Sequence, residues 1–195
     1  MRNRPLQVIP VAQRGHFTQA PHNAAGITLA ELLIAIGVTA ILAAIAAPNF
    51  AAVLRTNARS AAVNEFVHSL LLARSTAATS ANSVAICPSR NGLECNNGSG
   101  WETGWIVFQN TDRDQPPLRD SNELVLYRQH GWQHGTIRSN RTAFTFRRST
   151  QGDVNGTVVF CTRGSADEAR AIIISHSGRP RVSKRDASNR ALQCF

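Results

Sequence analysis

The stretch that decides the fold of this chain is Ala25-Gly26-Ile27-Thr28-Leu29-Ala30-Glu31-Leu32-Leu33. It opens an apolar run that continues to Ala47 and contains a single charge, Glu31. As a helix, residues 27–47 would span about 31 Å at 1.5 Å per residue, which matches the roughly 30 Å hydrocarbon core of a bilayer. A carboxylate in such a helix costs about 3 kcal/mol even on lenient insertion scales, so Glu31 is predicted to have a functional partner in the membrane.

Two other interpretations of this apolar run are a plain membrane anchor and a secretory signal peptide. The signal peptide would use a basic leader and a cleavage site at Ala44-Ile45-Ala46. Against it, the run is longer than the apolar core of a signal peptide and carries Glu31 near its start. Sequencing the mature amino terminus would distinguish Ile27 from a residue near Ala47.

The same arrangement resembles a type IV prepilin signal, with cleavage after Gly26, a new amino terminus at Ile27 and a carboxylate at the fifth mature position. The resemblance implies that Gly26, Ile27 and Glu31 are processing residues and that a prepilin peptidase is a partner. It also implies that Glu31 pairs with the amino terminus of a neighbouring subunit, because an opposite charge compensates burial in low dielectric. Ile27 replaces the family's commoner phenylalanine.

The helical pattern continues beyond the apolar run. Pro48 lacks an N–H, so a kink or local unwinding is expected over residues 44–48. The helix is then predicted to reach about Thr79, with Arg55, Arg59 and Arg74 off its apolar face. That apolar stripe consists of Val53, Ala58, Ala62, Phe66, Leu70 and Ala73.

Beyond the helix, short runs rich in Val, Ile, Phe and Tyr alternate with Asn, Gly, Ser and Pro clusters, which predicts an antiparallel β domain. Residues 163–170 are predicted to be a polar connection. The six predicted strands are Ser83–Cys87, Gly104–Gln109, Glu123–Gln129, Thr142–Arg147, Gly156–Cys161 and Ala171–Ser175.

Four of these segments resemble the FimT/GspH group of minor pilins and pseudopilins. The first three are Gly104-Trp105-Ile106-Val107-Phe108 with the following Asp112-Arg113-Asp114, Phe144-Thr145-Phe146 with Gly152, and Gly156-Thr157-Val158-Val159-Phe160-Cys161. The fourth, Ile172-Ile173-Ile174-Ser175 leading to Gly178-Arg179-Pro180-Arg181, resembles the C-terminal hairpin of that group. The resemblance implies an α+β type IV pilin fold, in which a long N-terminal helix packs on an antiparallel β-sheet domain. The expected divisions are a leader peptide (1–26), a membrane-spanning and assembly half of the helix (27–47), an amphipathic half (48–80) and a globular β domain (81–195).

The four cysteines are an even set behind an export signal, so disulfides are expected in an oxidising periplasm. Three connectivities are possible. The favoured one pairs Cys87 with Cys95, which closes a Gly/Asn-rich loop, and Cys161 with Cys194, which ties the C-terminal tail to a strand. The spacings fit no zinc template well.

The chain carries a formal charge of +9, and the excess lies in its second half. From Leu124 onward there are twelve basic residues and four acidic ones, and all but one of the basic residues in the chain are arginine. A polyanionic partner or a merely soluble basic surface would each explain this bias. The sharpest feature is the turn at Gly178 and Pro180, which would present several cations to successive phosphates.

A GRxR motif at this turn resembles the DNA-contacting motif of the FimT pilins of competent bacteria, which implies that Arg179 and Arg181 bind DNA. Charge and proximity add Lys184, Arg185 and Arg190 to the predicted DNA-binding set. Backbone contacts would be independent of base sequence and sensitive to salt. Trp132 is a candidate for stacking on single strands.

No other group of residues in the sequence predicts a catalytic or metal-binding site. His130 and His134 are each followed by a glycine, Gly131 and Gly135, which predicts a loop and ordinary surface histidines. Asp112 and Asp114 fit a turn better than a calcium site. The sequence therefore predicts neither an enzyme nor a cofactor or metal site.

Two functions follow as hypotheses. The first is a minor type IV pilin that binds extracellular DNA for uptake in natural transformation. The second is a structural minor pilin, or a type II secretion pseudopilin, that primes filament assembly without DNA. In both, the partners are other major and minor pilins, and the protein is a single-pass inner-membrane protein with a periplasmic C-terminal domain before it enters the filament.

Overall fold

The computed structural model describes residues 26–96, 98–148, 154–163 and 165–194. The chain divides into two units, residues 1–44 and 45–195, and each is described by itself. The elements, in order, are α1 (Leu29–Thr79), β1 (Ser83–Pro88), the 3₁₀ helix η1 (Trp101–Thr103), β2 (Gly104–Asn110), β3 (Val125–His130), β4 (Gly135–Ser139), β5 (Phe144–Phe146), β6 (Gly156–Thr162), β7 (Ser165–Ile174) and β8 (Pro180–Ser183).

Helix α1 ends at Thr79, where the apolar periodicity predicted its end. Local unwinding near Pro48, one of the two expected distortions, is wrong, because the backbone is helical throughout residues 44–48. A kink there stays a prediction. By length and composition, α1 is apolar enough to cross a membrane. Its first part, residues 29–44, exposes every side chain within its own unit. The boundaries at residues 26, 47 and 80 stay predictions.

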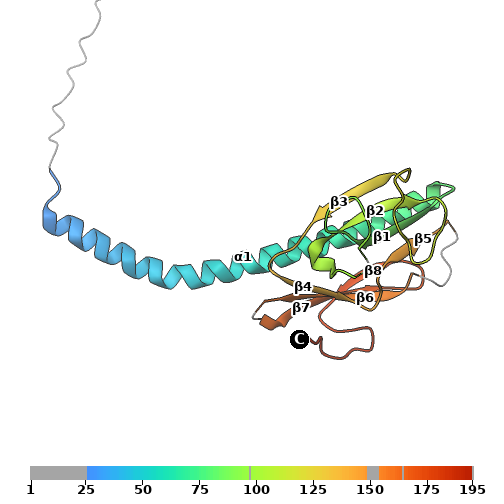
Figure 1. Cartoon of the computed structure of the whole chain (residues 1–195). Coiled ribbons are helices and arrows are strands. Elements are labelled where there is room, and N and C mark those ends of the chain that lie inside the picture. The colour runs from blue at the N-terminus through green and yellow to red at the C-terminus, as the bar shows by residue number, and fades with distance from the viewer. Residues whose placement is uncertain (1–25, 97, 149–153, 164, 195) are drawn as a thin grey trace, which may run out of the picture. The chain divides into compact units, whose positions relative to one another are not determined.

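Two four-stranded antiparallel sheets follow α1 (Figure 1). One has the strand order β3-β2-β1-β5 and the other β4-β6-β7-β8. The domain is therefore α+β, as predicted. All six predicted strands are present, but β4 and β8 were not among them, and residues 165–170 belong to β7 instead of a polar connection. β4 has Ile137 as its only buried residue, so it lacks the alternation that identifies a strand.

The core lies where α1 meets the inner faces of both sheets. Phe66 of α1 is fully buried at its centre and makes edge-to-face contacts with Trp101, Trp105, Phe144 and Phe160 at centroid distances of 5.0–6.3 Å. β1 is buried on both faces, because a second cluster covers its outer side. That second cluster consists of Ala85, Cys87, Ile106 and Phe108, with Cys95, Val125 and Ala143 packed against it.

Two predictions about the faces of α1 need correction. Ala62, Phe66, Leu70 and Ala73 of the stripe are buried as expected and Ala58 is half-buried, whereas Val53 is 54% exposed. Arg59 was placed off the apolar face, yet its side chain is only 3% exposed, and its Nη1 lies 2.6 Å from Oε2 of Glu168. The long side chain reaches a carboxylate of β7, a partner that helical periodicity alone does not reveal.

A hydrogen bond between Tyr127 of β3 and Glu65 of α1 joins the helix to the edge of its sheet. Burial, followed by this hydrogen bond and the charge of Glu65, raises the pKa of Tyr127 from 10.0 to about 12. The folded state therefore favours the neutral phenol. Stability from this group is complete below pH 10 and is lost as the pH rises from about 10 to about 12.

Because Tyr127 is the only tyrosine in the chain, phenolate absorbance reports on it directly. We expect an ionisation midpoint near pH 12 in the folded protein. Glu65→Gln should lower the midpoint, but not to 10.0, since the burial that contributes most is retained. An unchanged midpoint in the Glu65→Gln variant would contradict the Tyr127–Glu65 contact.

Candidate functional site

The basic segment at the C-terminal end of the chain is a β-hairpin between β7 and β8. Ile173 pairs with Arg181 and Ile174 pairs with Pro180. The connecting turn is closed by backbone hydrogen bonds from Ser175 N to Arg179 O (3.1 Å) and from Gly178 N to Ser175 O (2.8 Å). Ser175 Oγ also accepts a hydrogen bond from Arg179 N at 3.2 Å. The backbone that carries the two motif arginines is thus fixed by local contacts.

Gly178 is required in this turn for two reasons. Its φ is +71°, a conformation that side chains with a Cβ rarely adopt. A Cβ at this position would also lie 2.9 Å from Cε1 of Phe146, so the turn packs directly on the ring of β5. The glycine of the GRxR motif therefore determines both the shape of the turn and its packing against the domain.

Arg179, Arg181 and Lys184 extend from this hairpin into solvent. Among the residues that the structure describes, none of the three side chains has a hydrogen bond or an ion pair. A guanidinium or ammonium group without a protein partner is available to an anion, and arginine can bind phosphate through two parallel N–H donors.

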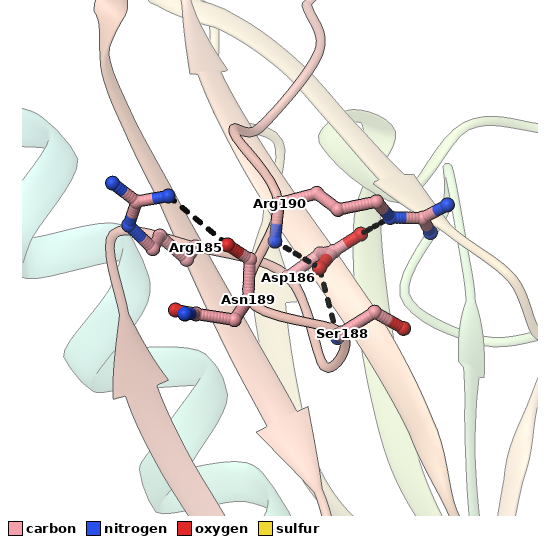
Figure 2. A network of polar contacts seen from close by, with 5 residues as sticks. All are labelled: Arg185, Asp186, Ser188, Asn189 and Arg190. Carbon is pink, nitrogen blue, oxygen red and sulfur yellow. Dashed lines mark hydrogen bonds and ion pairs between the residues drawn. The ribbon is translucent and has the colours of Figure 1, made fainter.

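Arg185 and Arg190 are engaged in a loop of their own (Figure 2). Asp186 accepts hydrogen bonds from the backbone N–H of Ser188 and of Arg190, each at 2.8 Å, and from Nε of Arg190 at 2.8 Å. Arg185 donates from Nη1 to the carbonyl oxygen of Asn189 at 3.0 Å. The Arg190 N–H and guanidinium hold the pKa of Asp186 below its usual value. The two arginines are therefore partly occupied, a restriction that counting charges did not reveal.

Both disulfides have the pairing that the spacings favoured. Cys87 is joined to Cys95, with 5.5 Å between their Cα atoms, and Cys161 to Cys194, with 5.6 Å. The second bond ties the end of the tail to β6, so the segment after β8 returns to the sheet that carries the hairpin.

The amino-terminal unit contains a second group of polar contacts. Glu31 Oε2 accepts hydrogen bonds from Thr28 N (3.4 Å) and Thr28 Oγ1 (3.3 Å), and Thr28 Oγ1 accepts one from Glu31 N (3.2 Å). This is a capping box at the start of α1. Its sequence signature, Thr-x-x-Glu, was overlooked because Glu31 was interpreted only through its charge.

Three other predictions concern residues outside the hairpin. Trp132 is not available for stacking, because it is only 8% exposed and packs on Phe160. Asp114 lies in a turn, where its carboxylate accepts hydrogen bonds from Asn110 Nδ2 (2.9 Å) and Leu118 N (2.8 Å). In the described part of the chain, no group of three or more His, Cys, Asp or Glu side chains is placed to hold a metal ion.

Comparison with known proteins gives two family matches. Residues 62–178, more than half of the chain, match the family described as type II transport protein GspH. Residues 21–47 match the prokaryotic N-terminal methylation motif. A search of curated proteins found no match.

Two solved structures are also similar, both crystal forms of the type IV minor pilin FimU of Pseudomonas aeruginosa strain PAO1. Each is 20% identical with a TM-score of 0.49, and they cover 70% and 71% of this chain and 99% and 96% of their own.

Proposed function

The chain belongs to the GspH family, and on that premise we propose that it is a minor type IV pilin that binds extracellular DNA for uptake in natural transformation. The pilin-like role follows from the family and from the methylation motif at residues 21–47. The apolar first part of α1 is consistent with anchoring in a membrane and with incorporation into a filament. The proposal also includes binding to DNA, cleavage by a prepilin peptidase and a periplasmic orientation of the C-terminal domain.

In the proposed pathway, a prepilin peptidase cleaves after Gly26, Ile27 becomes the methylated amino terminus, and Glu31 pairs with that terminus in a neighbouring subunit. The capping box supports this pathway, because Thr28 offers the carboxylate an uncharged partner that an incoming ammonium group can replace. We expect the intact mass of the filament-incorporated protein to correspond to residues 27–195 with one methyl group and two disulfides. A mass that begins near Ala47 would contradict the pathway.

DNA binding is supported mainly by the two exposed guanidinium groups of Arg179 and Arg181. They lie on a turn that backbone hydrogen bonds hold in place. Neither group has a protein partner in the described chain. Cations fixed in this way can neutralise adjacent phosphates without first breaking contacts within the protein. Lys184 extends the same edge. Arg185 and Arg190 contribute less, because Asp186 and the Asn189 carbonyl already engage them.

The test is fluorescence anisotropy with the full chain in detergent micelles and a labelled DNA duplex, between about 50 and 200 mM salt. For wild type, the logarithm of the affinity should fall linearly with the logarithm of the salt concentration. Arg179→Gln/Arg181→Gln should weaken binding and reduce that slope by about 1.8, since each lost phosphate contact removes about 0.9.

Arg55→Gln/Arg128→Gln is the matched control, because it removes the same charge from exposed positions on α1 and β3. It should retain the wild-type slope. Unchanged binding in the hairpin variant, or an equal loss in the control, would refute the assignment of the site.

A second candidate is favoured by the description of the matched family as a type II transport protein. In that case the chain is a structural minor pilin or pseudopilin that primes filament assembly through the amino-terminal helix alone. A filament or secretion defect upon deletion, together with no measurable affinity of the wild-type protein for DNA, would select this function over the first.

A further inference from the structure

The turn at Gly178 packs against two segments that lie far from it in the sequence. A Cβ on Gly178 would lie 2.9 Å from Cε1 of Phe146, the last residue of β5, and 3.7 Å from Cδ of Arg74 on α1. Gly178 itself is buried. The hairpin tip, the end of β5 and the last turns of α1 therefore meet at one point.

Each of these segments carries arginine at that point or directly next to it in the chain. Arg74 is half-buried and its side chain lies beside the turn. Arg147 and Arg148 directly follow Phe146 and are exposed. Within the described ranges, none of the three has a hydrogen bond or ion pair. Together with the two hairpin arginines they form a group that we call the Gly178 cluster, which consists of Arg74, Arg147, Arg148, Arg179 and Arg181.

The surroundings of the cluster indicate which part of a nucleic acid it fits. Single strands are usually held by bases stacked on exposed aromatic rings. Phe146 is fully buried beneath Gly178, and Trp101, Trp105 and Trp132 are all in the core. Among the described residues, the cluster thus offers several guanidinium groups for phosphate and no exposed Trp, Tyr or Phe ring for bases. Such a surface suits a continuous phosphate backbone.

We infer that Arg74, Arg147 and Arg148 are DNA-contacting residues, and that the Gly178 cluster as a whole binds the phosphate backbone of double-stranded DNA. This inference rests on the proposed DNA binding by the hairpin and extends it to two further segments. The glycine of the motif acquires a second role, because only a residue without a Cβ lets the hairpin approach Phe146 this closely, and Arg74 lies in ordinary contact distance beside it.

The experiment uses the full chain in detergent micelles and measures the anisotropy of a labelled duplex over a series of salt concentrations. Arg74→Gln should reduce the slope of log affinity against log salt by about 0.9, and Arg147→Gln/Arg148→Gln by about 1.8. Arg128→Gln and Arg55→Gln/Arg128→Gln are the controls for one and two lost charges, and both should retain the wild-type slope. Circular dichroism and the fluorescence of the buried tryptophans verify that each variant is folded.

The outcomes separate this inference from the proposed function. If Arg179→Gln/Arg181→Gln weakens binding while the Arg74 and Arg147/Arg148 variants behave as wild type, the hairpin site stands and the composite site is refuted. If the hairpin variant also binds normally, or the wild type does not bind DNA, both are refuted. A duplex that binds no more tightly than a single strand of equal length would refute the assignment to double-stranded DNA.

Discussion

Phe66→Ala is expected to lower the free energy of unfolding by about 3–5 kcal/mol, the range for truncating a fully buried aromatic side chain. Phe66 is 0% exposed and lies against four aromatic rings from η1, β2, β5 and β6. Its loss leaves a cavity that rigid neighbouring rings cannot fill and removes edge-to-face contacts between α1 and both sheets. Urea unfolding of the full chain in micelles, followed by tryptophan fluorescence, measures the change.

Leu71→Ala is the matched control, because Leu71 is on the same helix and is 46% exposed. Its loss should cost less than about 1 kcal/mol, since little apolar area returns to water. A loss of similar size in both variants would mean that Phe66 does not organise the core.

Glu168→Gln is expected to cost about 2–3 kcal/mol, because it leaves the Arg59 guanidinium buried without a counter-charge. Arg59 is 3% exposed, and its Nε has no hydrogen-bond partner among the described residues, so the contact with Glu168 is its principal compensation. Removing one partner of a fully buried pair typically costs about 3–5 kcal/mol. The lower value applies here because the Glu168 side chain is 39% exposed and water can approach it.

A double-mutant cycle isolates this pair from other effects of the substitution. In the Arg59→Met background the buried guanidinium is gone, so Glu168→Gln should then cost less than about 1 kcal/mol. Equal costs in the two backgrounds would show that Arg59 and Glu168 do not interact in solution.

Sequence predictions were correct where they depended on residues that lie close together along the chain. The end of α1 at Thr79 and the six predicted strands depend on periodicity and on turn residues close by in the chain, so local patterns identify them. The Cys87–Cys95 pairing is similarly local. β4 and the first half of β7 were missed, because their polar residues show no alternation and only pairing with β6 defines them as strands.

Side-chain environments were predicted less well than elements. Arg59 and Trp132 were both expected to be accessible and are both buried, because residues distant in the sequence cover them. Arg190 was included among the DNA-binding cations, yet its guanidinium contacts Asp186, four residues earlier. A charged residue that is expected to be exposed can thus already be paired within the folded chain.

By itself, the sequence determined what depends on neighbours along the chain: an apolar helix with Glu31 at its start, the turn at Gly178 with its two arginines, and the β character of the second half. Only the tertiary structure decided which charges gather around that turn and which are already neutralised. The reason is physical. Helical and strand periodicity relate residues a few positions apart, whereas the approach of Arg74, Phe146 and Gly178 depends on how sheets pack on a helix.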